Sequence, residues 1–229
     1  MHVPDGFFTA ATSGATAVVA AVGVGVALRG ARRELDDRTA PLAGLVAVFV
    51  FAAQMLNFPV GAGTSGHLLG GALAAVLVGP FTATLCIAVV LLIQALAFAD
   101  GGLTALGTNV VLMGLVGVWA GYGVFLLVRS VLPRALGAIP VAAAVGALVS
   151  VPVTALAFTG LYAVGGAAPI DTGALAAAMV GWHTLIGIGE AVITFLAVGS
   201  IVAARPDLVY GARGLASPAD LQIREGLSV

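Results

Sequence analysis

Long uninterrupted runs of apolar residues dominate this chain and predict its architecture. Six runs reach or approach the ~20 residues that one membrane-crossing helix requires. They cover roughly residues 8–28, 41–57, 68–99, 109–128, 136–162 and 173–203. The pattern predicts an all-α integral membrane protein.

The third run, 68–99, is too long for one comfortable crossing, and Gly79-Pro80 stands inside it. A proline at such a point can end one helix and open the next, because its ring clashes with the preceding turn and its fixed φ suits a first helical position. The run is therefore either one kinked helix or a hairpin of two helices, of which the first, about 68–79, is short and tilted or partly sunken.

The arginine positions favour the hairpin. Arginines near helix ends mark the cytoplasmic side of a membrane protein. The nine arginines are Arg29, Arg32, Arg33, Arg38, Arg129, Arg134, Arg205, Arg213 and Arg224. A hairpin at Gly79-Pro80 places all nine on one side, whereas a single helix over 68–99 places Arg129 and Arg134 opposite the first cluster. The sequence therefore predicts seven transmembrane helices, with the N-terminus outside and the C-terminus in the cytoplasm.

This topology divides the chain into three segments. Residues 1–7 lie outside, residues 8–203 form the seven-helix membrane domain, and residues 204–229, which regain charge and proline, form a cytoplasmic tail. A secretory signal peptide places basic residues before its apolar core, whereas here the first basic residue, Arg29, follows that core. We therefore expect the first helix to be retained and the chain to be a multi-pass protein of the cell membrane.

Composition and charge exclude several classes of function. Hydrophobic residues make up 61% of the chain and charged residues 8%, with a mean hydropathy of +1.16. A soluble domain carries about a quarter of charged residues, so the lipid bilayer is the main solvent. The chain has no lysine, which excludes a GxxxxGK[ST] phosphate loop, and it has no basic patch for nucleic acid. It also lacks the HExxH motif of zinc proteases, so we expect no zinc protease activity.

The N-terminus carries an unusual set of metal-binding groups. His2 follows Met1 directly, and because methionine removal generally requires a small second residue, Met1 should stay, with a free amine after deformylation. The Met1 amine, the His2 backbone nitrogen and the His2 imidazole can close a five-membered and a six-membered chelate ring. One further imidazole completes a square of four nitrogens, a geometry suited to Ni2+ or Cu2+.

His67 is the natural fourth ligand. It ends a glycine-rich segment, residues 61–67, that the topology places on the same outer side as His2, and glycine lets a loop bring its backbone close to a site. The alternative for each histidine is an interfacial or core residue with no metal. His183, the third histidine, lies within the last membrane run.

Four sequence blocks resemble one family of transport proteins. They are Met1-His2-Val3-Pro4-Asp5-Gly6; residues 54–60 (QMLNFPV) with 63–67 (GTSGH); Gln94-Ala95 through residues 100–102 (DGG) to 106–109 (LGTN); and residues 183–191 (HTLIGIGEA). In these blocks the chain is similar to the CbiM/NikM family, the substrate-binding subunits of energy-coupling-factor cobalt and nickel transporters. The blocks span residues 1–191 in the expected order.

The resemblance implies a seven-helix subunit whose inserted N-terminal segment binds the metal through Met1, His2 and His67. It implies an importer of the ATP-binding-cassette type, in which ATP is hydrolysed by separate ATPase subunits that act through a coupling (T) membrane subunit, with a small accessory membrane subunit as a further possible partner. Ni2+ or Co2+ is then cargo, the chain is a transport subunit rather than an enzyme, and no bound cofactor is expected. The departure at residues 60–62, where a bulkier proline-containing turn is expected, touches no proposed ligand.

Other polar residues in or near the spans are costly in lipid and call for a role. Gln54, Asn57 and Ser65 neighbour His67 in sequence, and we expect them to orient its loop, with helix–helix hydrogen bonding as the alternative for the first two. His183 and Glu190 share one helix face about 10 Å apart. They are either part of a proton path or, as we prefer, polar contacts that support the metal site. Asp5 and Asp100 could attract cations or cap turns.

Two rival functions remain at this point. A secondary transporter acting alone could couple metal to protons through Glu190 and Asp100, and a membrane metalloenzyme is the other rival. The choice between nickel and cobalt is open, because four nitrogens in a plane favour Ni2+ on ligand-field grounds and yet the same ligands can hold Co2+.

Overall fold

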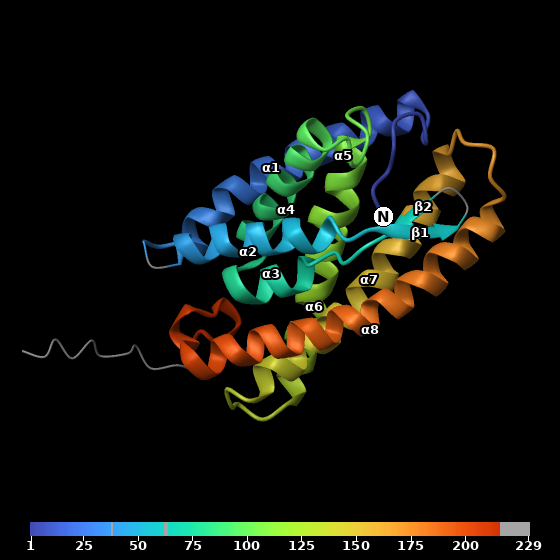
Figure 1. Ribbon diagram of the computed structural model, residues 1–229. Coiled ribbons are helices and arrows are strands. Elements are labelled where there is room, and N and C mark those ends of the chain that lie inside the picture. The colour runs from blue at the N-terminus through green and yellow to red at the C-terminus, as the bar shows by residue number, and fades with distance from the viewer. Residues whose placement is uncertain (38, 62–63, 216–229) are drawn as a thin grey trace, which may run out of the picture.

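The computed structural model describes residues 1–37, 39–61 and 64–215, so Arg38, Arg224, Ala62 and most of the predicted tail lie outside the described residues. The helices pack side by side as a bundle, with a short β-hairpin near one end (Figure 1). The long helices are α1 (Ala10–Glu34), α2 (Ala40–Gln54), α4 (Pro80–Ala97), α6 (Val118–Val131), α7 (Ala138–Gly165) and α8 (Thr172–Ala204). The shorter helices are α3 (Gly71–Val78) and α5 (Leu106–Asn109). Helix α5 continues through the π-helical stretch Val110–Gly117 into α6. Two 3-10 turns, Pro206–Leu208 and Tyr210–Ala212, follow α8.

The predicted apolar runs all form helices. Five helices of the described chain are long and apolar enough to cross a membrane: α1, α4, the continuous helix Leu106–Val131, α7 and α8. The other two are α2, with 15 residues, and α3, with 8. All eight residues of α3 are buried, so it lies within the bundle as the short, sunken first leg that the sequence predicts. The protein is a multi-pass membrane protein, and the crossing by α2 and α3 stays a prediction.

The break at Gly79-Pro80 is confirmed. α3 ends at Val78, Gly79 takes a φ of +95°, which favours glycine, and Pro80 is the first residue of α4. The buried Glu34 carboxylate at the end of α1 accepts hydrogen bonds from the Phe81 and Thr82 amides at 3.1 and 2.7 Å. A carboxylate at a helix N-terminus satisfies unpaired N–H groups and the helix dipole. It therefore fastens the end of α1 to the turn between α3 and α4.

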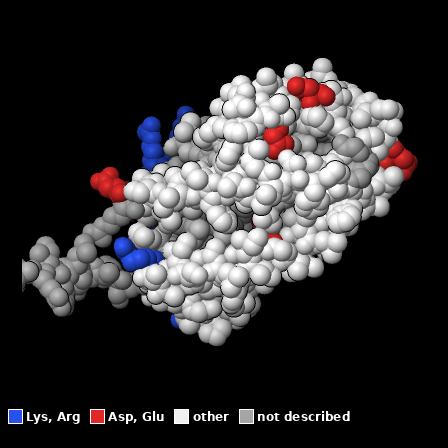
Figure 2. All heavy atoms as spheres, in the orientation of Figure 1, with Lys and Arg blue, Asp and Glu red and all other residues white. Residues whose placement is uncertain are grey.

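The described arginines gather at one end of the bundle, and Figure 2 shows this on the visible face. The Arg213 guanidinium donates to the Glu34 carbonyl at 2.6 Å, and Arg129 Nη2 lies 3.5 Å from the Arg213 carbonyl. The ends of α1 and α6 and the segment after α8 thus meet. This distribution is the one that a hairpin at Gly79-Pro80 requires, whereas the side of the membrane on which it lies stays a prediction.

Cysteine labelling tests that side. With Cys86 replaced, Asp37→Cys and Ala135→Cys at the arginine-rich end should be shielded from an impermeant thiol reagent in intact cells. Leu103→Cys and Ala167→Cys should react, because these residues lie in exposed connections at the opposite end. Labelling after permeabilisation controls for reactivity. Reaction of Ala135→Cys but not Asp37→Cys in intact cells would mean that the chain crosses the membrane one time fewer.

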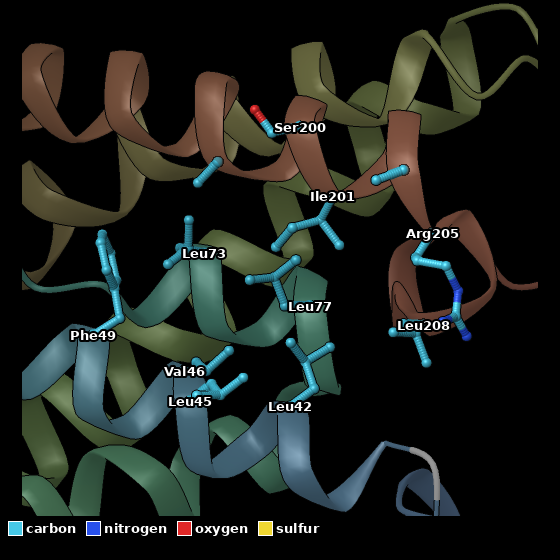
Figure 3. A pocket seen from close by; sticks show the side chains of 12 residues that line it. Leu42, Leu45, Val46, Phe49, Leu73, Leu77, Ser200, Ile201, Arg205 and Leu208 are labelled. Atoms are coloured by element: carbon cyan, nitrogen blue, oxygen red, sulfur yellow. The ribbon is translucent and has the colours of Figure 1, made fainter.

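The short length of α3 leaves an apolar groove on the bundle surface. α2 and α8 form its two sides and α3 its floor (Figure 3). The groove encloses about 470 Å3, and its lining includes Leu45, Phe49, Leu73 and Ile201. An eight-residue helix is only about 12 Å long, so it cannot fill the space between two longer neighbours.

The all-α prediction needs one correction. β1 (Phe58–Gly61) and β2 (Thr64–Gly66) form an antiparallel hairpin where the sequence analysis expected only a glycine-rich loop. A Cβ on Gly66 would lie 2.5 Å from Val60 Cγ1, so any larger residue there would push that side chain aside. The hairpin leads directly into His67 and therefore helps to place it.

Candidate metal site

The first three residues are buried inside the protein rather than free at its surface. Met1 is 1% exposed, His2 7% and Val3 0%, and Figure 1 shows the N-terminus reaching back beside β1. Asn109 holds the Val3 peptide groups from both sides: its Oδ1 accepts from Val3 N at 2.8 Å, and its Nδ2 donates to the Val3 carbonyl at 3.2 Å. The Gly102 amide also donates to this carbonyl at 2.8 Å.

The rest of the N-terminal segment is anchored in two ways. Asp5 Oδ1 accepts from the Thr104 amide at 2.8 Å, so Asp5 caps a turn, one of the two roles expected for it. Phe7 and Phe8 are buried against Phe158 and Tyr162 of α7. The segment before α1 is therefore a packed part of the fold.

The surroundings of His2 leave one ring nitrogen unpaired. His2 Nε2 lies 3.0 Å from Gln94 Oε1, and since an amide oxygen can only accept, Nε2 carries the proton and Nδ1 keeps its lone pair. His2 Nδ1 has no hydrogen-bond partner, although Asp100 Oδ1 lies 3.2 Å away. Nδ1 is the nitrogen that a six-membered chelate ring with the backbone requires.

His67 presents a second unpaired nitrogen to the same place. Its ring stacks on that of His2, with centroids 4.3 Å apart and planes inclined by 26°. His67 Nδ1 donates to the Leu68 carbonyl at 2.8 Å, which leaves Nε2 buried without a partner. The structure thus brings together the two histidines that the sequence analysis paired.

Electrostatics keep these groups in the uncharged form that a metal ion needs. Burial, with a smaller opposing contribution from the Asp100 carboxylate, holds the pKa of the Met1 amine well below its usual range. Burial and the nearby amine lower the pKa of His2 to about 4, against the opposing effects of Asp100 and Gln94. Burial, the amine and His2 likewise lower the pKa of His67. Metal ligands must be deprotonated, and the lowered pKa values favour that form of all three groups.

His183 is a third imidazole close to this cluster. It is fully buried in α8, its Nδ1 donates to the Met179 carbonyl at 2.7 Å, and its Nε2 has no partner. It lies close enough to contribute to the lowered pKa of His67. Its place fits the support from a neighbouring helix that the sequence analysis preferred, and its unpaired nitrogen makes it the main competitor of His67 as a ligand.

Gln54 and Glu190 form hydrogen bonds with the backbone just after His67. Gln54 Nε2 donates to the Leu69 carbonyl at 2.8 Å. The Glu190 carboxylate accepts from the Leu69 and Gly70 amides at 2.7 and 3.0 Å. These two amides stand at the N-terminus of α3, where a negative charge is favourable. α2 and α8 thus hold the same residue, two positions from His67.

The other residues expected to support the site lie further from the histidines. Asn57 is exposed beyond the end of α2, and its Nδ2 lies 3.3 Å from Asp100 Oδ2, so it contacts the site through Asp100. Ser65 pairs with Pro59 in the β-hairpin and is half-buried. Sequence reasoning assigned no role to Gln94 and Asn109, which orient His2 and Val3. Both are buried polar residues in an apolar stretch, and the high cost of such groups in lipid was the signal that could have singled them out.

Among the described residues, no three His, Cys, Asp or Glu side chains form a cluster able to hold a metal ion. The four nitrogens predicted from the sequence differ from such a cluster, because two of them belong to the main chain. They are the Met1 amine, the His2 backbone nitrogen, His2 Nδ1 and His67 Nε2.

Comparison with known proteins shows where this arrangement belongs. The family model CbiM, described as the cobalt uptake substrate-specific transmembrane region, matches residues 2–208. A putative metal transport protein of Haloquadratum walsbyi is 40% identical over 210 residues, which are 92% of this chain and 94% of that protein. The cobalt transport protein CbiM of Sorangium cellulosum is 37% identical over 91% of this chain and 94% of its own length.

A fused transport protein and a solved structure show the same relationship. A putative fused nickel transport protein, NikMN, of Archaeoglobus fulgidus is 38% identical over 91% of this chain and 68% of that protein. The crystal structure of a truncated transition metal transporter superposes with a TM-score of 0.82 and 29% identity, covering 89% of this chain and 99% of that one. The chain therefore belongs to the CbiM family of membrane proteins for cobalt and nickel uptake, as its sequence blocks predict.

Proposed function

We propose that this chain is the substrate-binding subunit of an energy-coupling-factor importer and captures Ni2+ or Co2+ at its outer end. In this proposal residues 1–7 are the metal-binding segment. The Met1 amine, the backbone and Nδ1 nitrogens of His2, and Nε2 of His67 surround the ion in a plane. The names of its relatives support Ni2+ or Co2+ as the cargo, and the chemistry of the nitrogen ligands supports the proposed positions of those ligands.

The observation that carries this proposal is the pair of buried, unpaired nitrogens on His2 and His67. A buried polar atom without a hydrogen bond costs about 1–3 kcal/mol, and native proteins rarely leave such atoms unsatisfied. Here Nδ1 of His2 and Nε2 of His67 are both unsatisfied on two stacked rings. A metal ion between them would satisfy both.

The position of Asp100 also supports a metal ion bound at His2. Its Oδ1 lies 3.2 Å from His2 Nδ1. Because that nitrogen keeps its lone pair, the two electron-rich atoms repel each other unless a positive charge lies nearby. A divalent cation bound to Nδ1 supplies that charge. Asp100 would then neutralise part of the charge of the ion without being one of the four nitrogen ligands.

Uptake against a gradient needs energy that this chain does not supply by a phosphate loop, because it contains no lysine. We propose that ATPase subunits and a coupling (T) membrane subunit supply it, with a small accessory membrane subunit as a further partner. Helix α1 offers a surface for a membrane partner, since it is the least buried of the membrane-length helices. The rival remains a proton-coupled transporter that acts alone.

Metal analysis tests the capture of the metal. The purified chain with its native N-terminus, exposed to equal Ni2+ and Co2+ and then desalted, should retain one ion per chain and, because four nitrogens in a plane favour Ni2+, mainly nickel. Vesicles containing this chain alone should show no metal-linked proton flux. Such a flux would contradict the ATP-driven proposal and support the rival.

Glu190→Gln tests the role of the contacts at Leu69. Glutamine keeps the size of the side chain but replaces one acceptor oxygen by an NH2 group that opposes an amide N–H. We expect the apparent dissociation constant for Ni2+ to rise by ~10–100-fold, the usual effect of losing a group that orients a ligand. Ser200→Ala on the same helix, where the hydroxyl bonds only the Leu196 carbonyl, is the matched control. Unchanged affinity in Glu190→Gln would remove this residue from the support of the site.

A further inference from the structure

A second cavity lies at the opposite end of the molecule, far from the metal site. It is formed where α6 ends, where α7 begins and where the chain passes after the turn Tyr210–Ala212. It encloses about 560 Å3. Arg129, Arg134 and Arg213 line it together with the apolar side chains of Leu126, Leu132 and Ile139. It therefore combines a strongly basic part with an apolar wall.

The positive charge in this cavity is not balanced by the described part of the chain. Among the residues that the structure describes, no Asp or Glu lines the cavity. Within residues 1–37, 39–61 and 64–215, none of the three arginines forms an ion pair, whereas Arg205 pairs with Asp207 at 2.7 Å. A guanidinium carries five N–H donors. Arg129 and Arg213 each donate one hydrogen bond to a backbone carbonyl, so most of these donors are left for a ligand.

One of the three guanidinium groups is held in place before any ligand binds. Arg213 donates to the Glu34 carbonyl at 2.6 Å and lies over the Tyr210 ring, with its central carbon 4.4 Å from the ring centroid. A fixed side chain loses less conformational entropy on binding. Planar guanidinium groups match the oxygens of a phosphate, which they bind through two parallel hydrogen bonds.

The place of the cavity in the fold favours a membrane lipid as the source of such a phosphate. It lies at the ends of two helices that are long enough to cross a membrane, Leu106–Val131 and Ala138–Gly165. Next to it on α6, Leu127 is 67% exposed and Val131 78%, so apolar surface continues from the basic cavity along the helix. A phospholipid has this same order of groups, with its phosphate at the headgroup level and its acyl chains below.

From these features we propose that the cavity between Arg129, Arg134 and Arg213 binds the phosphate of an anionic membrane lipid. The arginine-rich end is the predicted cytoplasmic end, and basic pockets between membrane helices on that side suit anionic headgroups. The inference does not depend on the metal site, because none of its residues contacts Met1, His2 or His67.

Native mass spectrometry of the full chain tests this inference. Protein delipidated in a neutral detergent is mixed with dioleoylphosphatidylglycerol or with dioleoylphosphatidylcholine, and retained lipid is counted. The unaltered chain should retain phosphatidylglycerol in preference. The double variant Arg129→Gln with Arg134→Gln should lower this retention by about tenfold or more. Arg213 is left in place because it also bonds to the Glu34 carbonyl.

Two controls make the outcome decisive. Arg32→Gln removes an exposed arginine at the end of α1, outside the cavity, and should retain lipid like the unaltered chain. Equal loss in this control and in the double variant would reduce the effect to net charge and overturn the site. Displacement of phosphatidylglycerol by millimolar inorganic phosphate would assign the cavity to a soluble phosphate instead.

A protein partner is the other outcome to distinguish. If the double variant keeps its lipid but no longer co-purifies with a coupling membrane subunit or ATPase subunits that the unaltered chain retains, the arginines form a protein-docking surface and the lipid proposal is wrong. Thermal unfolding midpoints of the delipidated proteins, and their metal content, report whether the variants fold normally. The conservative double variant Arg129→Lys with Arg134→Lys keeps the charge and should restore part of the retention.

Discussion

A single extra residue before Met1 should abolish high-affinity binding of Ni2+ and Co2+. The added peptide bond turns the Met1 amine into an amide, which removes one ligand and breaks the count of atoms in the chelate rings. It also demands space where there is none, since Met1 is 1% exposed and the next residues are fixed by Asn109. Retention of the formyl group should have the same effect.

A removable extension makes this experiment clean. A tag that a protease cleaves directly before Met1 should give a protein without tight metal binding before cleavage and with one ion per chain after it. An extension of equal length after Val229 is the control and should change nothing. Tight one-to-one nickel binding by the N-terminally extended protein would rule out the amine as a ligand.

His2→Ala and His67→Ala should each abolish metal binding at micromolar concentration. Each removes an imidazole nitrogen from the proposed square, and the affinity loss should exceed ~100-fold, because even the loss of a group that only orients a ligand costs ~10–100-fold. Both variants should still fold and insert. The Leu69 contacts of Gln54 and Glu190 and the Val3 contacts of Asn109 do not involve either imidazole. In His67→Gly, added imidazole should restore part of the binding.

His183→Ala separates support from coordination. It should weaken nickel binding but leave the visible absorption band of a low-spin square-planar Ni2+ site, because its Nε2 is not one of the four proposed nitrogens. This comparison matters since Nε2 of His183 is as unpaired as Nε2 of His67. If His183→Ala erases the band and His67→Ala leaves it unchanged, the fourth ligand is His183.

The hydrophobic pattern alone was sufficient for the class of fold and the helical segments. Membrane helices are specified by local composition, because every residue of a span must suit the same apolar solvent. The hairpin at Gly79-Pro80 was predicted because proline ends one helix and begins the next, and because arginines mark the cytoplasmic side of a membrane protein. The β-hairpin before His67 was not predicted, since a short strand pair in a glycine-rich segment depends on its packing against α8.

For the site, the sequence was sufficient to pair His2 with His67, because the free N-terminus and the shared outer side point to one chemistry. Only the tertiary structure decided which ring nitrogens are available, how deeply Met1 is buried and what holds the site in place. Those properties depend on Gln94, Asn109 and Glu190, which lie 92, 106 and 121 positions from the residues they contact. Contacts across such separations leave no periodic trace in a sequence, because the packing of the helices rather than a local pattern sets them. The same reason applies to the cavity in which Arg129, Arg134 and Arg213 meet.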